Sequence, residues 1–364
     1  MLLKQATSKS DIKSYLTFVN NLYKGDNSYV CTQKFSMQAL LFKSTDFAKS
    51  CFIQPVMIID NNETVAVCSF IHNPKLPYLF IGLFEAKQNK QEAIRLIIER
   101  AKQLAAERGL DKIVVGLNGH LTYGVGILED GGTKKMSFDS IYNKPYYKDY
   151  FLPYSYKKET LSTYLADVDE VYEKLKNFKE RDNIYIREAN IKNNFMLEME
   201  SFRTLSNNTI GTTFLYSEAD DFHLYQQIKG LKPLLKNENL FFATSKATTS
   251  DVKDKDIGFM FWHPDFNTFL TSGKNHNLLQ LFFKMNKAHK YADTIKINAI
   301  GAGYDNPFII AQLIKAFSQK AIGRYKFLET SFIWDNNQKS SALAKNLLGE
   351  PFRKYGVYFI DAKN

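Results

Sequence analysis

The residue pattern with the clearest chemical potential lies where an alternating, β-branched stretch, residues 294–300, runs into an apolar helical stretch. Between the two is a small and flexible turn of three residues, Gly301, Ala302 and Gly303. Asp305 and Asn306 are able to cap the following helix, and Pro307 suits its first turn. The N–H groups at a helix N-terminus lack partners within the helix and attract anions. The sequence therefore predicts an anion site at this turn.

Carboxylates near the expected strands are further candidates for chemistry. Glu329 and Asp335 are an even number of positions apart, so along one strand, expected at residues 327–334 and beyond, they share a face. Glu329 has the chemistry of a general base, and a solvated carboxylate at a strand edge is the alternative. Asp265 and Asn267 follow another expected strand, where they either orient an amine substrate or close a turn.

Other catalytic chemistries lack their motifs. The six histidines include no HExxH pairing, and no GxSxG elbow exists for a serine hydrolase. The cysteines are widely spaced and contain no CxxC: they are Cys31, Cys51 and Cys68. They predict buried, reduced thiols in a cytoplasmic protein and not a disulfide framework. We therefore expect no metal site.

Two glycine patterns and one aromatic cluster offer rival interpretations. Residues 126–131 have the spacing of a phosphate loop, but a Gly-Thr pair follows where Lys-Ser/Thr is needed. Gly301, Gly303 and Asn306 make a GxGxxN pattern, which lacks the last glycine of a dinucleotide fingerprint. The tyrosine-rich stretch 142–156 predicts packing or a pocket wall, because no nucleic-acid module accompanies it.

Composition places the chain among globular proteins. It has 364 residues, of which 45% are hydrophobic and 14% aromatic, enough for two packed domains. The net charge of +10 comes mostly from scattered lysines, which either form a solvated surface or favour an acidic ligand. The start of the sequence, MLLKQATSKSD, is too polar for a signal peptide, and no apolar run has the length of a membrane span.

The elements expected to hold these residues recur in one order, which is helix, antiparallel strands, strand, helix, strand. In the first half they are residues 12–24, 56–59 with 64–71, 78–84, 91–108, 112–117 and 159–166. In the second half they are 184–187, 193–205, 217–231, 240–244 with 257–262, 294–300, a helix from 307, and 327–334. The repeat predicts a duplicated α/β fold, with domains at 1–166 and 184–364 joined by a charged linker helix at 167–183.

The chain also resembles the GNAT acyltransferase superfamily. The matching pieces in the first half are residues 22–26, 82–85, 126–128 with 130–131, and 142–143 with 145–147. Those in the second half are residues 258–259, 264–267, 331–337, Gly349, and 354–355 with Tyr358. They span nearly the full length, so the chain resembles a bacterial family with two tandem GNAT-like halves. Each half would be a mixed, mostly antiparallel sheet flanked by helices.

The resemblance implies a cytoplasmic N-acyltransferase that uses acetyl-CoA or a longer acyl-CoA and acts on a small-molecule amine, without a nucleic-acid partner. It implies that strands 294–300 and 327–334 splay, with pantetheine between them and the pyrophosphate at the next helix start. The implied cofactor contacts are Ala299, Ile300, Gly301, Ala302, Gly303, Asn306, Phe308 and Asn337. Tyr358 takes the place of a general acid, and Glu329 remains the candidate base.

The phosphate signature of the superfamily is altered in this sequence. Asp305, Phe308 and Ile310 stand where the signature has Arg or Gln, then Gly, then Gly or Ala. We expect Phe308 to crowd a pyrophosphate and Asp305 to repel it. Residues 84–90 of the first half contain no glycine, so that half is expected to be degenerate. The alternative hypothesis is a non-catalytic, GNAT-derived protein that binds a small molecule or regulates another process.

Overall fold

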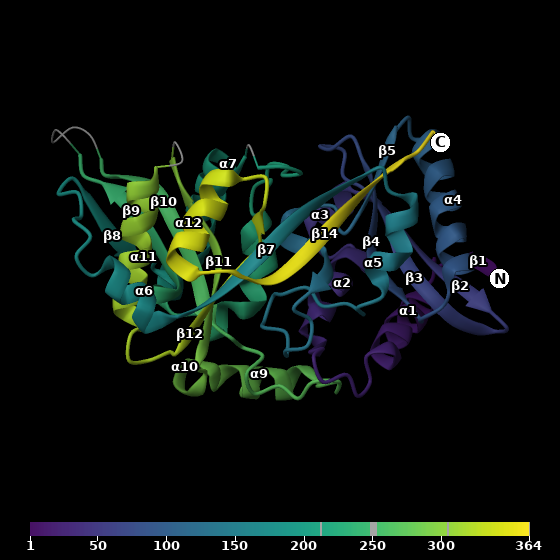
Figure 1. Ribbon diagram of the computed structural model, residues 1–364, viewed down its shortest axis with the longest axis horizontal. Helices are drawn as coiled ribbons and strands as arrows, with labels where there is room; N and C mark the ends of the chain where they lie inside the picture. The colour runs from purple at the N-terminus through teal and green to yellow at the C-terminus, as the bar shows by residue number, and fades with distance from the viewer. Residues whose placement is uncertain (212, 248–252, 304–305, 364) are drawn as a thin grey trace.

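The computed structural model of the chain describes residues 1–211, 213–247, 253–303 and 306–363 (Figure 1). The first half contains β1 (Leu2–Gln5), α1 (Lys9–Leu22), α2 (Lys34–Leu41), α3 (Asp46–Ser50), β2 (Phe52–Asp60), β3 (Glu63–His72), β4 (Leu79–Ala86), α4 (Gln91–Glu107), β5 (Lys112–Val115), β6 (Ile127–Asp130), α5 (Tyr147–Phe151) and β7 (Lys157–Asp167). The second half contains α6 (Val168–Leu175), β8 (Ile184–Glu188), α7 (Ile191–Ile210), α8 (His223–Ile228), β9 (Leu240–Ser245), β10 (Lys255–Pro264), α9 (Leu278–Asn286), α10 (Ala288–Tyr291), β11 (Thr294–Ala302), α11 (Pro307–Ala321), β12 (Phe327–Thr330), β13 (Ile333–Trp334), α12 (Gln338–Leu348) and β14 (Pro351–Asp361).

The strands form one continuous sheet in which the two halves exchange their last strands. The order is β1-β2-β3-β4-β5-β14-β7-β12-β11-β10-β9-β8, with β6 beside β14 and β13 beside β7. β14 comes from the second half, yet it pairs with β5 of the first, with Tyr358 opposite Val115. β7 comes from the first half, yet it pairs with β12 of the second, with Leu165 opposite Glu329. The two exchanged strands run side by side across the middle of the molecule (Figure 1).

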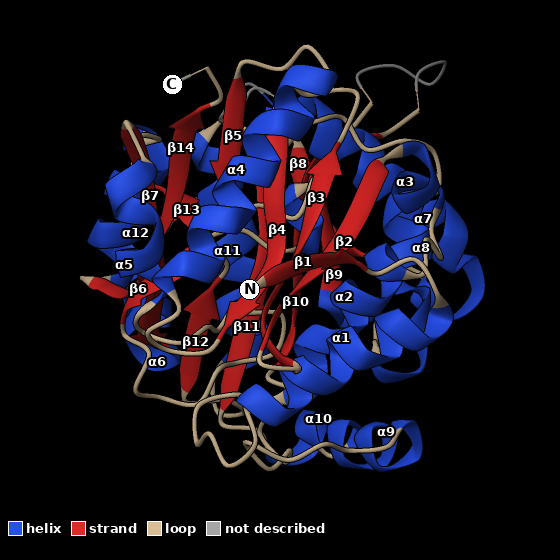
Figure 2. Ribbon diagram, turned by 90° about the vertical axis from the view of Figure 1, so that its right-hand side faces the viewer, coloured by secondary structure: helices blue, strands red, loops and turns tan. Residues whose placement is uncertain are grey.

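Each half contains one parallel strand pair that separates after a few residues. In the first half β4 pairs with β5 only as far as Ile81 and Val115. In the second half β11 pairs with β12 only as far as Ile297 and Thr330. The helix that connects each pair, α4 or α11, packs on the sheet as a parallel crossover requires (Figure 2). The predicted duplicated α/β fold, with its mixed and mostly antiparallel sheet, is confirmed.

Helix α4 shows how the hydrophobic pattern produces this packing. Its buried residues recur at helical spacing along one face: Ala93, Ile94, Ile97, Ile98, Ala101, Leu104 and Ala105. That face covers the first-half sheet, and burying each large aliphatic side chain stabilises the fold by about 1.5–3 kcal/mol. The helix ends at Glu107 with Arg108 as its C-cap, and Gly109 follows with a φ of +66°, a conformation that glycine adopts without strain.

Three local predictions were wrong. The turn predicted at residues 301–303 starts too early, because β11 continues to Ala302, and Gly301 and Ala302 pair with β10. The single strand predicted at 327–334 is divided into β12 and β13, because Ile333 and Trp334 pair with β7 and leave β11. The helix predicted at 217–231 is only the short α8, which continues as 3-10 turns through Lys229–Leu234. Pro233 lies in those turns, and its missing N–H cannot continue an α-helix. The domain limits and the linker helix at 167–183 stay a prediction; α6 covers the first part of that linker.

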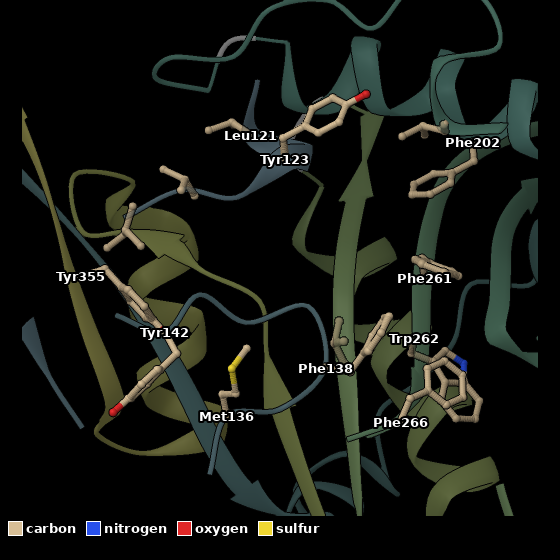
Figure 3. Packing of buried hydrophobic residues seen from close by; sticks show 14 of the residues in the cluster. Leu121, Tyr123, Met136, Phe138, Tyr142, Phe202, Phe261, Trp262, Phe266 and Tyr355 are labelled. Atoms are coloured by element: carbon tan, nitrogen blue, oxygen red, sulfur yellow. The ribbon is translucent and has the colours of Figure 1, made fainter. Parts of the chain in front are cut away.

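A loop of the first half between β6 and α5 docks into the second half (Figure 3). The ring of Phe138 lies 5.4 Å from that of Phe266 and 5.3 Å from that of His263, between ring centroids. The backbone N–H of Phe138 donates to Asp265 Oδ1 at 2.7 Å. Asn267 Nδ2 donates to the Met136 carbonyl in the same loop. Asp265 and Asn267 therefore hold this loop in place. The sequence had left open whether they orient an amine or close a turn.

Candidate functional site

The strands β11 and β12 open into a cavity of about 860 Å³. Their last shared bond runs from the N–H of Ser331 to the carbonyl of Ile297, at 2.7 Å. Beyond it, the edge of β11 that faced β12 has no strand partner among the described residues. In this opening the cavity is lined by Ile310 and Ile314 of α11 and by Ser340 and Ala344 of α12. It also extends into the first half, where Ile81 and Gly116 line it at the place where β4 and β5 separate.

Asp335 explains why the two strands separate. Its carboxylate accepts hydrogen bonds from Thr160 Oγ1 at 2.6 Å and from Ser162 Oγ at 2.9 Å. Its backbone N–H donates to the Thr160 carbonyl at 3.0 Å. These bonds attach the chain after β13 to β7 and draw it away from β11. The sequence had predicted that Asp335 and Glu329 share one strand face. The structure shows that they do not, because Asp335 follows β13 and is bonded to β7.

The structure brings only part of the predicted cofactor set to the cavity. Ala299, Ile300 and Asn337 line it. Asn337 also caps α12, because its side chain accepts from the N–H of Ser340 at 3.1 Å. The remaining described members are not among the lining residues: Gly301, Ala302, Gly303, Asn306 and Phe308. Asp305, predicted as a cap and as a repulsive charge, lies outside the described residues.

The start of α11 is capped by its own chain. Asn306 Oδ1 accepts from the N–H of Phe308 at 3.1 Å. The Asn306 carbonyl accepts from the N–H groups of Ile309 and Ile310 at 3.1 and 3.2 Å. An anion at this helix start would compete with Asn306 for these three groups, so the anion site predicted here remains a prediction.

Phe308 lies away from the cavity. Its side chain is 50% exposed, and its ring packs near Phe178 and beneath the guanidinium of Arg181, 4.7 Å from the ring centroid. The expected crowding of a pyrophosphate by Phe308 assumed that the ring points inward from the helix start. The ring instead points toward the segment that follows α6.

Asp139 and Ser140 of the docked loop meet β11 at the floor of the cavity. Asp139 Oδ2 accepts from Asn298 Nδ2 at 2.8 Å, and Ser140 Oγ is hydrogen-bonded to Lys296 Nζ. All four residues line the cavity. Asp139 adopts a φ of +61°, which is uncommon for a residue with a side chain, so the surrounding contacts must hold it there.

The floor combines buried ionisable groups with the exposed carboxylate of Asp139. Enclosure by protein raises the pKa of the Asp139 carboxyl, although the side chain stays open to the cavity. Burial lowers the pKa of the Lys296 ammonium, although the negative charges of Glu329 and Asp139 act to raise it. Burial also raises the pKa of Asp265 to about 6 and lowers that of His263 to about 4. His263 is therefore neutral near pH 7, and its Nε2 atom has no hydrogen-bond partner among the described residues.

Glu329 forms a buried ion pair beside this floor. Its Oε1 atom lies 2.6 Å from Arg353 Nη1, and the two side chains are 4% and 3% exposed. Arg353 also donates to the Lys135 carbonyl at 3.0 Å. Glu329 is not among the described residues that line the cavity. The structure thus gives Glu329 a charged partner that links β12 to β14, and its predicted role as a base remains a prediction.

Tyr358 lies apart from Glu329 and from the opening between β11 and β12. Its hydroxyl donates to Glu129 Oε1 at 2.5 Å, and its ring belongs to the first-half core. The reason is the strand exchange, because a residue late in the second half of the sequence lies in the first half of the molecule. Tyr355, on the same strand, does line the cavity, and its hydroxyl donates to the Ile141 carbonyl at 3.3 Å.

In the first half, where β4 leaves β5, tyrosine hydroxyls form hydrogen bonds with the backbone groups that follow the strand separation. Tyr147 Oη accepts from the N–H of Ala86 at 2.7 Å, and Tyr146 Oη donates to the Ala86 carbonyl at 2.8 Å. Tyr150 Oη donates to the Lys87 carbonyl at 2.7 Å and accepts from the N–H of Lys90 at 3.2 Å, just before α4. The N–H and carbonyl groups that a bound cofactor would use are thus satisfied by the protein itself.

Sequence reasoning missed Asp139, Asn298 and Tyr355 as cavity residues. Asp139 lies in a stretch that reads as a loop between glycines and tyrosines, and no motif marks it. Asn298 stands inside the alternating strand, where a polar residue among β-branched ones was the available signal. Within the described residues no group of His, Cys, Asp and Glu could hold a metal ion, and the three cysteines are buried and unpaired.

The splayed parallel pair, its connecting helix and the duplicated order of elements define the GNAT acyltransferase fold. Among solved structures, the tandem GNAT protein from the clavulanic acid biosynthesis pathway, without AcCoA, is similar over 99% of both chains, with a TM-score of 0.57 and 9% identity. A protein from Enterococcus faecalis V583, named as a probable N-acyltransferase, is similar over 99% of this chain and 70% of its own, with a TM-score of 0.50 and 9% identity.

These similarities establish the fold, and the expected resemblance to tandem GNAT proteins is confirmed at that level. No protein-family model matches the sequence, and no curated protein matches it.

Proposed function

We propose that the protein is an acyl-CoA-dependent N-acyltransferase whose second half binds the cofactor. The observation that supports this most is the opening between β11 and β12, where residues 298–300 line a large cavity. An extended pantetheine chain placed there would lie along β11 as an additional strand does. Ala299, Ile300 and Asn337 would contact it. No described residue is assigned to the phosphates, because the amides at the start of α11 are bonded to Asn306.

Asp139 is the residue we assign as general base for the amine. An amine enters as an ammonium ion and must lose a proton before it attacks an acyl carbon. The carboxylate of Asp139 attracts that cation, and the raised pKa of the carboxyl makes it a better proton acceptor. Asn298 keeps the carboxylate oriented through its 2.8 Å hydrogen bond. Lys296, held by Ser140, supplies a compensating positive charge at the same floor.

A phenol at the cavity, which donates to the Ile141 carbonyl in this structure, is the candidate proton donor for the leaving thiolate. Tyr355 lines the cavity, and burial raises the pKa of its hydroxyl, so the hydroxyl keeps its proton. We assign Tyr355 as the proton donor, in the role that the resemblance had given to Tyr358. Glu329 and Tyr358 remain alternative assignments for the base and the acid.

Two observations favour a second candidate function, a non-catalytic protein that binds a small molecule. The helix start that would meet the cofactor phosphates is satisfied by Asn306, and the first-half groups are satisfied by tyrosines. A protein of this kind would bind an amine or another small molecule in the cavity without transferring an acyl group.

Calorimetric titration with acetyl-CoA and with a longer acyl-CoA tests the proposal. We expect micromolar binding by the wild type. Ser340→Trp places a large ring in the cavity and should weaken binding at least about tenfold, which is about 1.4 kcal/mol. Ala342→Trp is the matched control, since Ala342 lies on the exposed side of the same helix.

Two results would contradict the proposal. One is the absence of acyl-CoA binding by the wild type. The other is equal binding by Ser340→Trp, which would place the cofactor elsewhere. Binding without acyl transfer to any of a panel of amines would support the non-catalytic candidate.

A further inference from the structure

One surface of the second half is both basic and apolar. From Phe266 to Ala292 the chain contains no Asp or Glu, and it carries four lysines, Lys274, Lys284, Lys287 and Lys290. The helices α9 and α10 in this segment lie along the lower edge of the molecule, outside the sheet (Figures 1 and 2). This segment is therefore free to meet a large partner without disturbing the sheet.

Helix α9 has two apolar faces and buries one of them. Leu281 and Met285 are buried against the protein, each 2% exposed. Leu279, Phe282 and Phe283 are 67%, 39% and 60% exposed. Their spacing of three and four positions places these three side chains together on a second face. Scattered exposed apolar residues are ordinary, but three large ones on one helix face indicate a site of contact.

Lysines from both halves lie close to α9, and Lys284 is in its last turn. The pKa of His276 is lowered first by burial and then by the nearby charges of Lys284, Lys34 and Lys274. Burial lowers the pKa of Lys135 in the docked first-half loop, the nearby Asp265 opposes that shift, and Lys284 adds to it. None of these lysines forms an ion pair within the part of the chain that the structure describes. The positive charge of Lys34, Lys274 and Lys284 thus has no ion-pair partner on this face.

We propose that α9 attaches the protein to the surface of an anionic lipid bilayer. Leu279, Phe282 and Phe283 would enter the boundary between headgroups and acyl chains, and the lysines would meet the lipid phosphates. An apolar helix face bordered by basic residues is the pattern of interfacial helices that lie in the plane of a membrane. No helix in the described residues is long and apolar enough to cross a bilayer, so the contact is with the surface only.

The charge of this face argues against a second copy of the chain as the occupant. A symmetric dimer through α9 would bring two sets of unpaired lysines together, and like charges at an interface oppose association. An anionic lipid surface removes the same repulsion, because each lysine finds a phosphate.

Vesicle flotation with the full chain tests this proposal. We expect binding to vesicles of phosphatidylglycerol and phosphatidylcholine, weaker binding at high salt, and little binding to pure phosphatidylcholine. The double variant Leu279→Ser/Phe283→Ser should bind the anionic vesicles at least about tenfold more weakly. The matched control is Leu152→Ser/Leu197→Ser, whose residues are 57% and 64% exposed on other elements and should leave binding unchanged.

A charge-reversal variant keeps the test decisive if the serine variant folds poorly. Lys287→Glu/Lys290→Glu changes only exposed side chains and should also lose vesicle binding. The proposal is overturned if the wild type ignores anionic vesicles or if the α9 variants bind as the wild type does. It is also overturned if light scattering shows a wild-type dimer that the serine variant abolishes, since the occupant would then be a second copy.

Discussion

Asp139 depends on contacts from both halves of the molecule. Its backbone has a positive φ, its carboxylate is bonded to Asn298 of β11, and its neighbours Phe138 and Ser140 are bonded to Asp265 and Lys296. A non-glycine residue in this region of φ costs about 1–2 kcal/mol, so these contacts must offset that cost. A carboxylate that is kept at the cavity floor in an unfavourable backbone conformation is a candidate for function.

Replacing Asp139 by Asn tests its role at the residue scale. The variant keeps the shape of the side chain but cannot accept the ammonium proton. We expect kcat to fall by about 10²–10⁴-fold while acyl-CoA affinity stays the same. Because the base must be ionised, wild-type activity should rise with pH through the raised pKa of Asp139, and this acidic limb should disappear in the variant.

Asp130→Asn is the control for this measurement, since Asp130 is exposed and lies outside the cavity. Loss of acyl-CoA binding in Asp139→Asn would show a structural role. An unchanged kcat would leave Glu329 as the base, and the same measurement on Glu329→Gln would then decide.

Glu85 predicts how stability depends on pH. Burial raises its pKa to about 8, although Tyr23 and Tyr147 donate hydrogen bonds to it. The folded state therefore keeps a proton that the unfolded state releases above its ordinary pKa. The contribution is unfavourable once the unfolded carboxyl ionises, so stability should fall as pH rises from about 4.5 to about 8, by up to about 1.4 kcal/mol per unit.

Urea unfolding at several pH values measures this slope. Glu85→Gln should remove this pH dependence. Compared with the wild type, the variant should therefore be relatively more stable at pH 8 than at pH 5. Glu99→Gln, at an exposed site on α4, should leave the slope unchanged. An unaltered slope in Glu85→Gln would assign the pH dependence to other groups.

At the scale of elements, the strand–helix–strand units followed from local sequence. Asn306 caps α11 and Asn337 caps α12, and β-branched alternation marks β11, so these elements were predictable. The break between β12 and β13 was not predictable from local sequence. It is caused by hydrogen bonds between Asp335 and residues of β7, which are far away in sequence. The sequence predicted a cavity residue only where that residue lies on the opened strand β11, as Ala299 does, or just before α12, as Asn337 does. Asp139 reaches the site by tertiary docking of a loop, which no local pattern reveals.

The tyrosines at the end of β4 give a prediction about the first half. Tyr147→Phe would leave the buried N–H of Ala86 without its acceptor and remove a donor to Glu85. We expect a loss of about 1–3 kcal/mol in the free energy of unfolding, measured in urea. Tyr154→Phe is the matched control, because its hydroxyl makes no hydrogen bond within the described residues. Equal stability of both variants would mean that water replaces the lost hydroxyl.

At the scale of the whole molecule, the exchange of β7 and β14 joins the two halves into one sheet. β14 pairs with β5 and β6 of the first half, and with β7 along most of its length. β7 in turn pairs with β12 and β13. The sequence indicated two similar halves, but the identity of a strand's neighbours depends on the assembled sheet, and for this reason the exchange was not predictable. It also moves Tyr358 into the first half and places Tyr355 at the cavity.

This exchange predicts that the halves unfold together. Removal of residues 351–364 deletes β14, so β5, β6 and β7 each lose a strand partner and the Glu329–Arg353 pair is broken. An uncompensated buried charge alone costs about 3–5 kcal/mol, which is a large part of the stability of an ordinary domain. We expect one cooperative calorimetric transition for the full chain and none for the truncated chain. Removal of residues 362–364 only, beyond β14, should preserve the transition. If the truncated chain instead keeps a transition at the original temperature, the second half folds by itself and the sheet does not couple the two halves.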